Sequence, residues 1–365
     1  KNVSVTGVIL GNDGRKMSKN YGNYPDPKMM LETYGGDALR LYLMGSPVMK
    51  GEDILISEEQ YKMQVRGTLL ILWNVYNFFV SYANVDSWKP NGQKQLAKSQ
   101  NVLDRWILSL KNRLIIEITE ALESYDTVSV INKIQDFVNN LSTWYVRRSR
   151  DRVGTSAENG QDKENFYNTT FNVLATLTKL FAPIAPFISE EIFRNLTEEE
   201  SVHLTDWPIP DEFLIDKKVE ENMEYSRKLV EQVHAVRKEQ GIRVRQPLNF
   251  LVTISPVNFN AVGTASIIQD EVNVKNIEVK QGDDVQIVSL DKEQTPELRD
   301  EGNARDLIRK IQDERKKLGT RLDEWVGVEL PEWPKDFEGE IKRKALVEKL
   351  TKADKFRVIR MKQNA

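Results

Sequence analysis

The chain has 365 residues and a mass of 42.2 kDa, which is enough for two or three domains with their own cores. Hydrophobic residues make up 40% and charged residues 29%, close to the average for globular proteins, so disorder along the whole chain is excluded. There is no cysteine, and His203 and His234 are the only histidines, which excludes disulfides and thiolate metal sites and argues against metal catalysis or a Ser-His-Asp site. No apolar run is long enough to cross a membrane. We therefore expect a cytoplasmic protein with no membrane partner.

The net charge gives no indication of nucleic-acid binding, because 52 basic and 55 acidic residues leave −3. Local charge differs, since residues 147–152, 305–321 and 342–362 are each strongly basic. One such run is typical of a solvated helix face. Three in one chain favour a polyanionic partner.

The first ten residues alternate apolar and polar side chains like a strand, and Gly11–Gly14 follows as a turn. The chain does not start with methionine. We interpret it as a piece of a longer protein that begins inside a folded domain.

The middle of the chain predicts long amphipathic helices. Ser57–Gln60 is a capping box, which predicts a helix start at this point. Four stripes of apolar residues at helical spacing follow, and Pro183 and Pro186 end the last of them. The stripes run from Val65 to Phe79, Leu103 to Leu122, Val130 to Trp144 and Phe166 to Phe181. Stripes joined by short polar loops predict a helical bundle.

The pattern changes after Trp207–Pro210, where we place a domain boundary. Strand-like segments follow at 250–254, 274–279 and 285–290, and a helix with Thr295 as its N-cap ends at Gly319. This mixture predicts a small α+β module. The sequence shows no internal repeat.

Lys16–Lys19 places two lysines on either side of a serine in a loop bounded by glycines. The long lysine stem allows an ammonium group to follow phosphate oxygens, so this loop could bind a polyphosphate. The P-loop pattern of nucleotide triphosphatases is absent. On the residues alone, a lysine-rich surface turn is the more common explanation.

Several segments resemble one family. Gly14–Lys19, with Gly22-Asn23 and Tyr34–Arg40, resembles the KMSKS loop of class I aminoacyl-tRNA synthetases and the helix after it. Further segments in the same order resemble the isoleucyl-tRNA synthetase family: Trp144–Arg152, Phe181–Pro183, Ser189–Glu191, Val202–Pro208, Gly241–Leu248 and Glu301–Leu307.

The resemblance implies that Lys16, Met17, Ser18 and Lys19 bind ATP, with Mg²⁺ in the parent enzyme, and that Lys19 is the catalytic lysine that steadies the phosphates as the aminoacyl-adenylate forms. Asn20 stands where the family usually has serine, and because asparagine is also small and polar we expect the loop to keep its form. The family activates isoleucine with ATP and attaches it to its tRNA. The resemblance therefore implies isoleucine, ATP and tRNA(Ile) as ligands of the parent enzyme.

The family's HIGH signature, amino-acid pocket and editing domain have no counterpart in this sequence. The chain therefore resembles the carboxy-terminal third of such an enzyme, and we predict that it is inactive alone. Some relatives carry a cysteine-ligated zinc, which this cysteine-free chain cannot hold, so no metal site is expected.

The arginine-rich segment 147–152 can be placed by helical geometry. At about 100° per residue, Arg148 and Arg152 continue the apolar stripe that ends at Trp144, while Arg147 and Arg150 face solvent. Solvent-facing arginines suit RNA phosphates, and an aromatic ring, Trp144 or Tyr145, could stack on a base. The predicted tRNA-binding residues are Trp144, Arg147, Arg148, Arg150 and Arg152.

The predicted fold is mainly α. Residues 1–55 are the tail of a Rossmann-type catalytic domain with its ATP loop, residues 56–212 a helical anticodon-binding bundle, and residues 213–365 an α+β module that contacts tRNA. Two alternatives stay open: a fragment of valyl-tRNA synthetase, and a helical RNA-binding protein with no enzymatic function.

Overall fold

The structure, a computed structural model, describes residues 5–90, 99–157, 160–259 and 263–361. It divides into two units, unit 1 with Lys1–Arg150 and Gln161–Asp216, and unit 2 with Asp151–Gly160 and Lys217–Ala365. The fold is mainly α, as predicted. The main division falls after residue 216, whereas the sequence places it after 212, and residues 1–55 group with the bundle.

Unit 1 opens with a small subdomain in which two short strands pair in parallel. The strand expected over the first ten residues is shorter, and its described part is two residues long. Asp26 begins the first helix by accepting hydrogen bonds from the N–H groups of Lys28 and Met29. The elements are β1 (Ile9–Leu10), α1 (Pro27–Tyr34), α2 (Gly36–Met44), η1 (Pro47–Lys50) and β2 (Ile54–Leu55).

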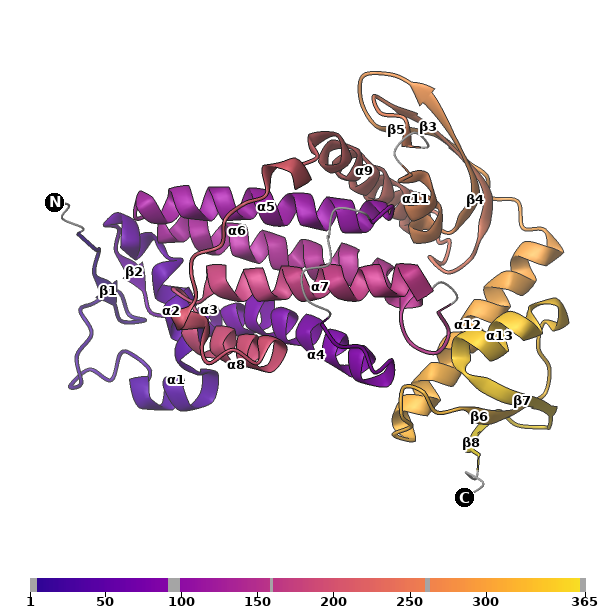
Figure 1. Cartoon of the computed structure of the whole chain (residues 1–365), viewed down its shortest axis with the longest axis horizontal. Helices are drawn as coiled ribbons and strands as arrows, with labels where there is room; N and C mark the ends of the chain where they lie inside the picture. The colour runs from indigo at the N-terminus through magenta and orange to yellow at the C-terminus, as the bar shows by residue number, and fades with distance from the viewer. Residues whose placement is uncertain (1–4, 91–98, 158–159, 260–262, 362–365) are drawn as a thin grey trace. The chain divides into compact units, whose positions relative to one another are not determined.

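The predicted bundle forms the rest of unit 1, and its long helices lie side by side (Figure 1). The capping box behaves as expected at its first residue, because Ser57 Oγ accepts the N–H of Gln60 at 3.4 Å. All four apolar stripes contribute fully buried residues, among them Leu72, Ile107, Ile134 and Phe166. The helices are α3 (Glu58–Gln64), α4 (Leu70–Val85), α5 (Val102–Glu123), α6 (Thr127–Asn140), α7 (Gly160–Phe181) and α8 (Pro186–Thr197).

Two π-helical segments, η2 (Val65–Leu69) and η4 (Leu141–Val146), interrupt the regular helical spacing. A π-turn holds an extra residue, so the side chains after it are rotated about the axis. In η4 the core position therefore passes to Tyr145, which is fully buried, and Trp144 is only half-buried. The prediction that Trp144 is the last core residue of this stripe is therefore wrong.

The connection from α8 to unit 2 contains two short 3₁₀ turns, η6 (Val202–Leu204) and η7 (Glu212–Leu214), and its last part lies along α5. Its attachment explains why polar side chains of α5, such as Ser109 and Asn112, are fully buried. Hydrogen bonds that hold it to α5 include Trp207 Nε1 to Thr119 Oγ1 (2.9 Å), Asp211 N to Asn112 Oδ1 (2.9 Å) and Asp216 N to Ser109 Oγ (2.8 Å). The segment after Trp207–Pro210 thus still packs on the bundle up to residue 216.

Unit 2 contains two α+β modules that follow one another along the chain. The first is α9 (Lys217–Glu239), β3 (Leu248–Ser255), α11 (Ala265–Val272), β4 (Val274–Gln281) and β5 (Gln286–Leu290). The second is α12 (Pro296–Lys317), β6 (Val326–Leu330), α13 (Glu338–Ala345), β7 (Val347–Lys352) and β8 (Arg357–Arg360), with η8 (Lys335–Phe337) before α13. The three predicted strands and the helix capped by Thr295 are present, whereas β6, β7 and β8 were missed.

The two modules share one topology. In each, the first strand lies in the middle of a three-stranded sheet, parallel to the strand after the short helix and antiparallel to the last strand. The turn after the long helix contains a glycine with positive φ in both, Gly241 (+66°) and Gly319 (+62°). The sequence shows no repeat because this topology depends on alternating burial and turn positions, which many different residues satisfy.

A buried arginine fixes that turn in each module. Arg237 and Arg315 are 0% and 4% exposed, and each donates to carbonyl oxygens of the sixth and the ninth residue after it. The acceptors are Arg243 O (3.0 Å) and Gln246 O (2.9 Å) in the first module, and Arg321 O (3.1 Å) and Glu324 O (2.5 Å) in the second. Burial of the guanidinium lowers the pKa of Arg237 to about 10, with a smaller contribution from Arg305.

Candidate functional site

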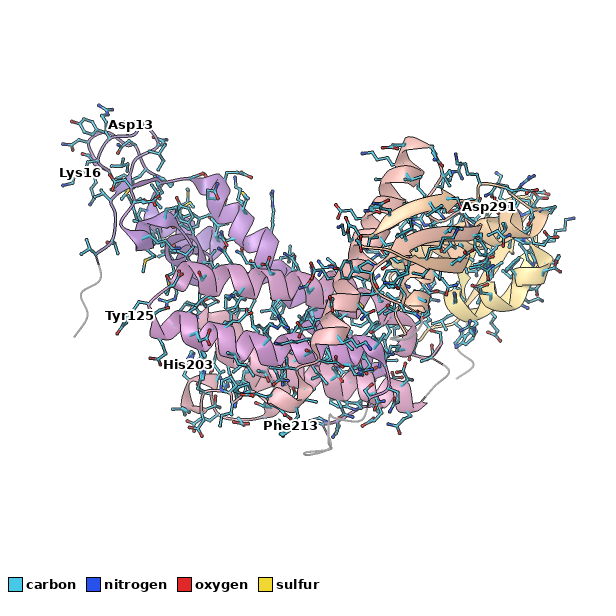
Figure 2. The ribbon with its side chains drawn as sticks, turned by 90° about the horizontal axis from the view of Figure 1, so that it is seen from above. Asp13, Lys16, Tyr125, His203, Phe213 and Asp291 are labelled. Atoms are coloured by element: carbon cyan, nitrogen blue, oxygen red, sulfur yellow. The ribbon has the colours of Figure 1, made fainter. Side chains whose placement is uncertain are left out.

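The lysine loop follows β1 and returns to it, because Leu10 and Lys16 form an isolated antiparallel bridge. Lys16 and Lys19 are exposed, while Met17 and Ser18 between them are half-buried. Figure 2 shows Asp13 and Lys16 together in this loop, at the end of unit 1 away from the long helices. The structure thus presents the two predicted phosphate-binding lysines to solvent from one loop.

Glycines allow the loop to turn sharply on both sides of the lysines. Gly14 has a φ of +78° and Gly22 a φ of +58°, and in both cases a side chain would meet no neighbour within 4 Å. The left-handed backbone itself therefore requires glycine here. Asn20, which differs from the family's usual serine, donates its backbone N–H to Ser18 Oγ at 3.3 Å.

Asn23 belongs to a segment that carries the family resemblance, but the sequence analysis assigns it no role. It is 4% exposed in a loop whose lysines are exposed, and its side chain bonds to Asp13, Lys16 and Ser18. The bond from Asn23 is the largest cause that lowers the pKa of Asp13 to about 2. Nothing in a polar loop sequence marks one asparagine as buried, so only the structure could identify it.

The segment Tyr34–Arg40 joins the loop subdomain to the bundle. Asp37 on α2 accepts the N–H groups of Phe187 (3.2 Å) and Ile188 (2.7 Å), which are the first donors of α8. Arg40 donates to the carbonyl oxygens just before that helix, Ile184 O (2.7 Å) and Pro183 O (2.8 Å). One helix thus binds both ends of the turn between α7 and α8, which ties the lysine loop's subdomain to the predicted RNA-binding bundle.

The arginine-rich segment lies where α6 and η4 end. Arg147 and Arg150 are exposed, and Arg148 and Arg152 are half-buried, as expected, although the regular helix assumed for them is interrupted by η4 and ends before Arg150. Arg147 Nε donates to Thr143 O at 2.7 Å, which directs its guanidinium along the helix surface. Arg152 falls in unit 2 by the division above, in the 3₁₀ turn η5 (Arg150–Arg152).

The two aromatic candidates of this segment have different surroundings. Tyr145 is fully buried, stacks on Phe166 at 5.7 Å and donates to Asp104 Oδ1 at 2.9 Å, so it is unable to stack on a base. Trp144 is half-buried and is the remaining aromatic candidate.

The basic runs of unit 2 are partly neutralised within their own helices. Several of their cations pair with acids three or four residues away, which is typical of a solvated helix face. The pairs include Arg305 with Glu301 (2.7 Å), Lys317 with Glu314 (2.6 Å), Lys342 with Glu338 (2.7 Å) and Lys344 with Glu340 (2.9 Å). Arg315 is buried and used structurally. These runs therefore add less to a polyanion surface than their sequence indicates.

The histidines and acids offer no metal site in the described ranges: no cluster of three or more potential ligands occurs there. His203 is exposed, and His234 Nε2 lies 3.8 Å from Glu271 Oε1. Of the helices described, none combines the length and the apolar character needed to span a bilayer.

Two family models match separate parts of the chain. Residues 1–55 match the class I tRNA synthetases of the I, L, M and V group, and residues 104–252 match the anticodon-binding domain of tRNA ligase.

Similar proteins with curated names are isoleucine–tRNA ligases. The isoleucine–tRNA ligase of Protochlamydia amoebophila is 40% identical over 76% of this chain and 27% of its own length. That of Dehalococcoides mccartyi is 35% identical over 89% of this chain and 34% of its own length. The chain thus spans about a third or less of the curated relatives it matches.

Among solved structures, the LeuRS–tRNA–LeuAMS ternary complex of Agrobacterium radiobacter K84 aligns with 77% of this chain and 32% of its own, at 17% identity and a TM-score of 0.45. The family of this chain is assigned from its sequence relatives and from the two matched domains. The chain is homologous to the isoleucine–tRNA ligases and contains matches to both the class I synthetase domain and the anticodon-binding domain of that family.

Proposed function

We propose that this chain supplies the ATP-phosphate loop and a tRNA-binding surface to a cytoplasmic enzyme that activates isoleucine with ATP and Mg²⁺ and attaches it to tRNA(Ile). The observation that carries the proposal is the 35–40% identity to isoleucine–tRNA ligases over most of the chain. The exposed lysine pair of the loop supplies the chemistry that such an enzyme needs at this place.

The two lysines would stabilise the negative charge that develops on the ATP phosphates. When the isoleucine carboxylate attacks the α-phosphorus of ATP, the bond to the β-phosphate breaks and negative charge grows on the leaving pyrophosphate. Lys19 and Lys16 place ammonium groups on a loop that is tied at its base, so they can stabilise this charge without a large rearrangement. Ser18, half-buried between them, orders the next turn through the N–H of Asn20.

The experiment is Lys19→Ala in the whole protein, measured by isoleucine-dependent pyrophosphate exchange. We expect the exchange rate to fall by about 10²-fold or more while the Michaelis constant for isoleucine barely changes, because the lysine acts in the transition state. Lys28→Ala is the matched control, since Lys28 is also an exposed lysine but lies outside the loop. An unchanged rate for Lys19→Ala would contradict the assignment of the loop. The 365-residue chain alone should show no exchange.

The tRNA surface is proposed at residues 144–150, where Arg147 and Arg150 are exposed and Trp144 is half-buried. Because phosphate contacts release counterions, the affinity for tRNA(Ile) should fall steeply with salt, and Arg150→Gln should weaken it and reduce the salt slope by about 1. Arg194→Gln, an exposed arginine on α8, is the control. Arg148, half-buried, should mainly affect stability. Binding of a noncognate tRNA with equal affinity would show that this surface is not selective.

A further inference from the structure

Asn23 uses both ends of its side-chain amide inside the lysine loop. Its Nδ2 donates to Asp13 Oδ1 at 2.8 Å and to Lys16 O at 3.3 Å, and its Oδ1 accepts the N–H of Ser18 at 3.0 Å. Its backbone carbonyl also accepts the N–H of Asn12 at 2.9 Å. One buried side chain therefore bonds to the main chain on both sides of Met17, between the two lysines.

The residues around the Asn23 side chain leave room for its amide and fix the carboxylate that it bonds to. A Cβ on Gly11 would lie 2.3 Å from Asn23 Nδ2 and 2.5 Å from its Cγ, so only glycine leaves room for the amide. On the other side Asp13 is held by Arg15, whose guanidinium lies 2.7 Å from the carboxylate and 4.5 Å from the centre of the Tyr21 ring. The amide thus lies between a glycine that admits it and a carboxylate that is fixed in place.

We propose that Asn23 is the positioning residue of the lysine loop: it fixes the Lys16–Ser18 backbone so that both ammonium groups meet the phosphates of a nucleoside triphosphate at a set spacing. This inference rests on the proposed function. An exposed loop held only at its ends would sample many conformations, and the lysines would be aligned with the transition state for a small part of the time. Preorganisation of charged groups is the main source of such stabilisation.

Asn23→Ala removes all three side-chain bonds and leaves the lysines intact. In the whole protein we expect isoleucine-dependent pyrophosphate exchange to slow by about 10- to 100-fold, with the Michaelis constant for isoleucine unchanged, because a displacement of about 1 Å costs that much. Asn12→Ala is the matched control: Asn12 lies in the same loop, and its side chain makes no hydrogen bond to any described residue.

A charge swap separates positioning from a general loss of structure. Asn23→Asp places two carboxylates at the 2.8 Å contact and should be at least as slow as Asn23→Ala. Asp13→Asn combined with Asn23→Asp restores one amide–carboxylate contact in the reverse sense but not the bond to Lys16 O, so it should recover only part of the rate. A double variant no faster than Asn23→Asp would overturn the proposal.

Hydrogen exchange on the 365-residue chain gives a readout that needs no catalysis. Asn23→Ala should accelerate exchange of the Ser18 amide while the melting temperature stays within about 1 °C of the native chain, since the loop is exposed. Unchanged protection of Ser18, or a rate loss that follows the unfolded fraction, would overturn the proposal. Failure of the proposed function is a different result: Lys19→Ala would then be as active as the native protein. If Lys19→Ala is slow and Asn23→Ala is normal, only the role of Asn23 is wrong.

Discussion

The contact between Asp37 and the start of α8 is the most informative place to perturb unit 1. Asp37 is 6% exposed and caps a helix that is distant in sequence, with bonds of 2.7 and 3.2 Å to the N–H groups of Ile188 and Phe187. The N-cap residue of α8 itself, Ala185, makes no side-chain bond. Asp37→Ala therefore leaves two helix donors without an acceptor in a place that water reaches poorly.

The expected cost follows from that geometry. Loss of a capping side chain costs about 0.5–2 kcal/mol, and a hydrogen bond to a charged group is worth about 1.5–3 kcal/mol. The desolvation of the carboxylate raises the pKa of Asp37 and so outweighs the effect of these bonds on its charge, which leaves the capping figure as the guide. We expect Asp37→Ala to lower the free energy of unfolding of unit 1 by about 1–2 kcal/mol, or its melting temperature by about 2–8 °C.

Asp26→Ala is the matched control. Asp26 caps α1 with the same two distances, 2.7 Å to the N–H of Lys28 and 3.2 Å to that of Met29, but it is exposed. Water can replace its bonds, so Asp26→Ala should cost less than half as much. Urea unfolding followed by circular dichroism measures both. Equal costs for the two variants, or a cost under about 0.5 kcal/mol for Asp37→Ala, would refute the argument from burial.

The stability difference between the native chain and Asp37→Ala should also depend on pH. Because the pKa of Asp37 is raised in the folded chain, the folded state binds this proton more readily than the unfolded chain, whose pKa is near 3.8. The contribution of Asp37 to stability is therefore fully present below pH 3.8 and decreases as the pH rises through the folded pKa. The difference between the native chain and Asp37→Ala should grow as the pH is lowered from 7 toward 4. A difference that shrinks would mean that the bonds outweigh the desolvation.

Three further predictions concern buried polar groups. Tyr145→Phe should cost about 1–2 kcal/mol in urea unfolding, because it removes the hydroxyl bonded to buried Asp104, whereas a surface tyrosine would cost little. Burial lowers the pKa of Lys111 from 10.5 to about 8, so between these values the unfolded chain binds this proton more readily than the folded chain. The free energy of unfolding of the native chain should therefore rise relative to that of Lys111→Met as the pH rises from 8 to 10.5. A difference that does not change with pH would contradict the burial of Lys111. Arg315→Met should accelerate amide hydrogen exchange in residues 319–325 and leave the equivalent turn after Arg237 protected. Equal acceleration in both turns would show that the two turns do not open independently.

The sequence by itself determined the parts of this protein that depend on local pattern. Helical stripes, the Ser57 and Thr295 caps and the glycine-bounded lysine loop each follow from the chemistry of a few neighbouring residues, and all are present in the structure.

Only the tertiary structure decided which polar residues are buried and what they bind. Asn23, Asp37 and Arg315 look like ordinary surface residues in the sequence, but each satisfies backbone groups that other segments bring to it. The π-turn before Arg147 moved the core position from Trp144 to Tyr145, because one inserted residue rotates everything after it, and no local signal announces such an insertion. The shared topology of the two modules was hidden for a related reason: strand pairing is set by backbone contacts between distant segments, and these contacts place few demands on residue identity.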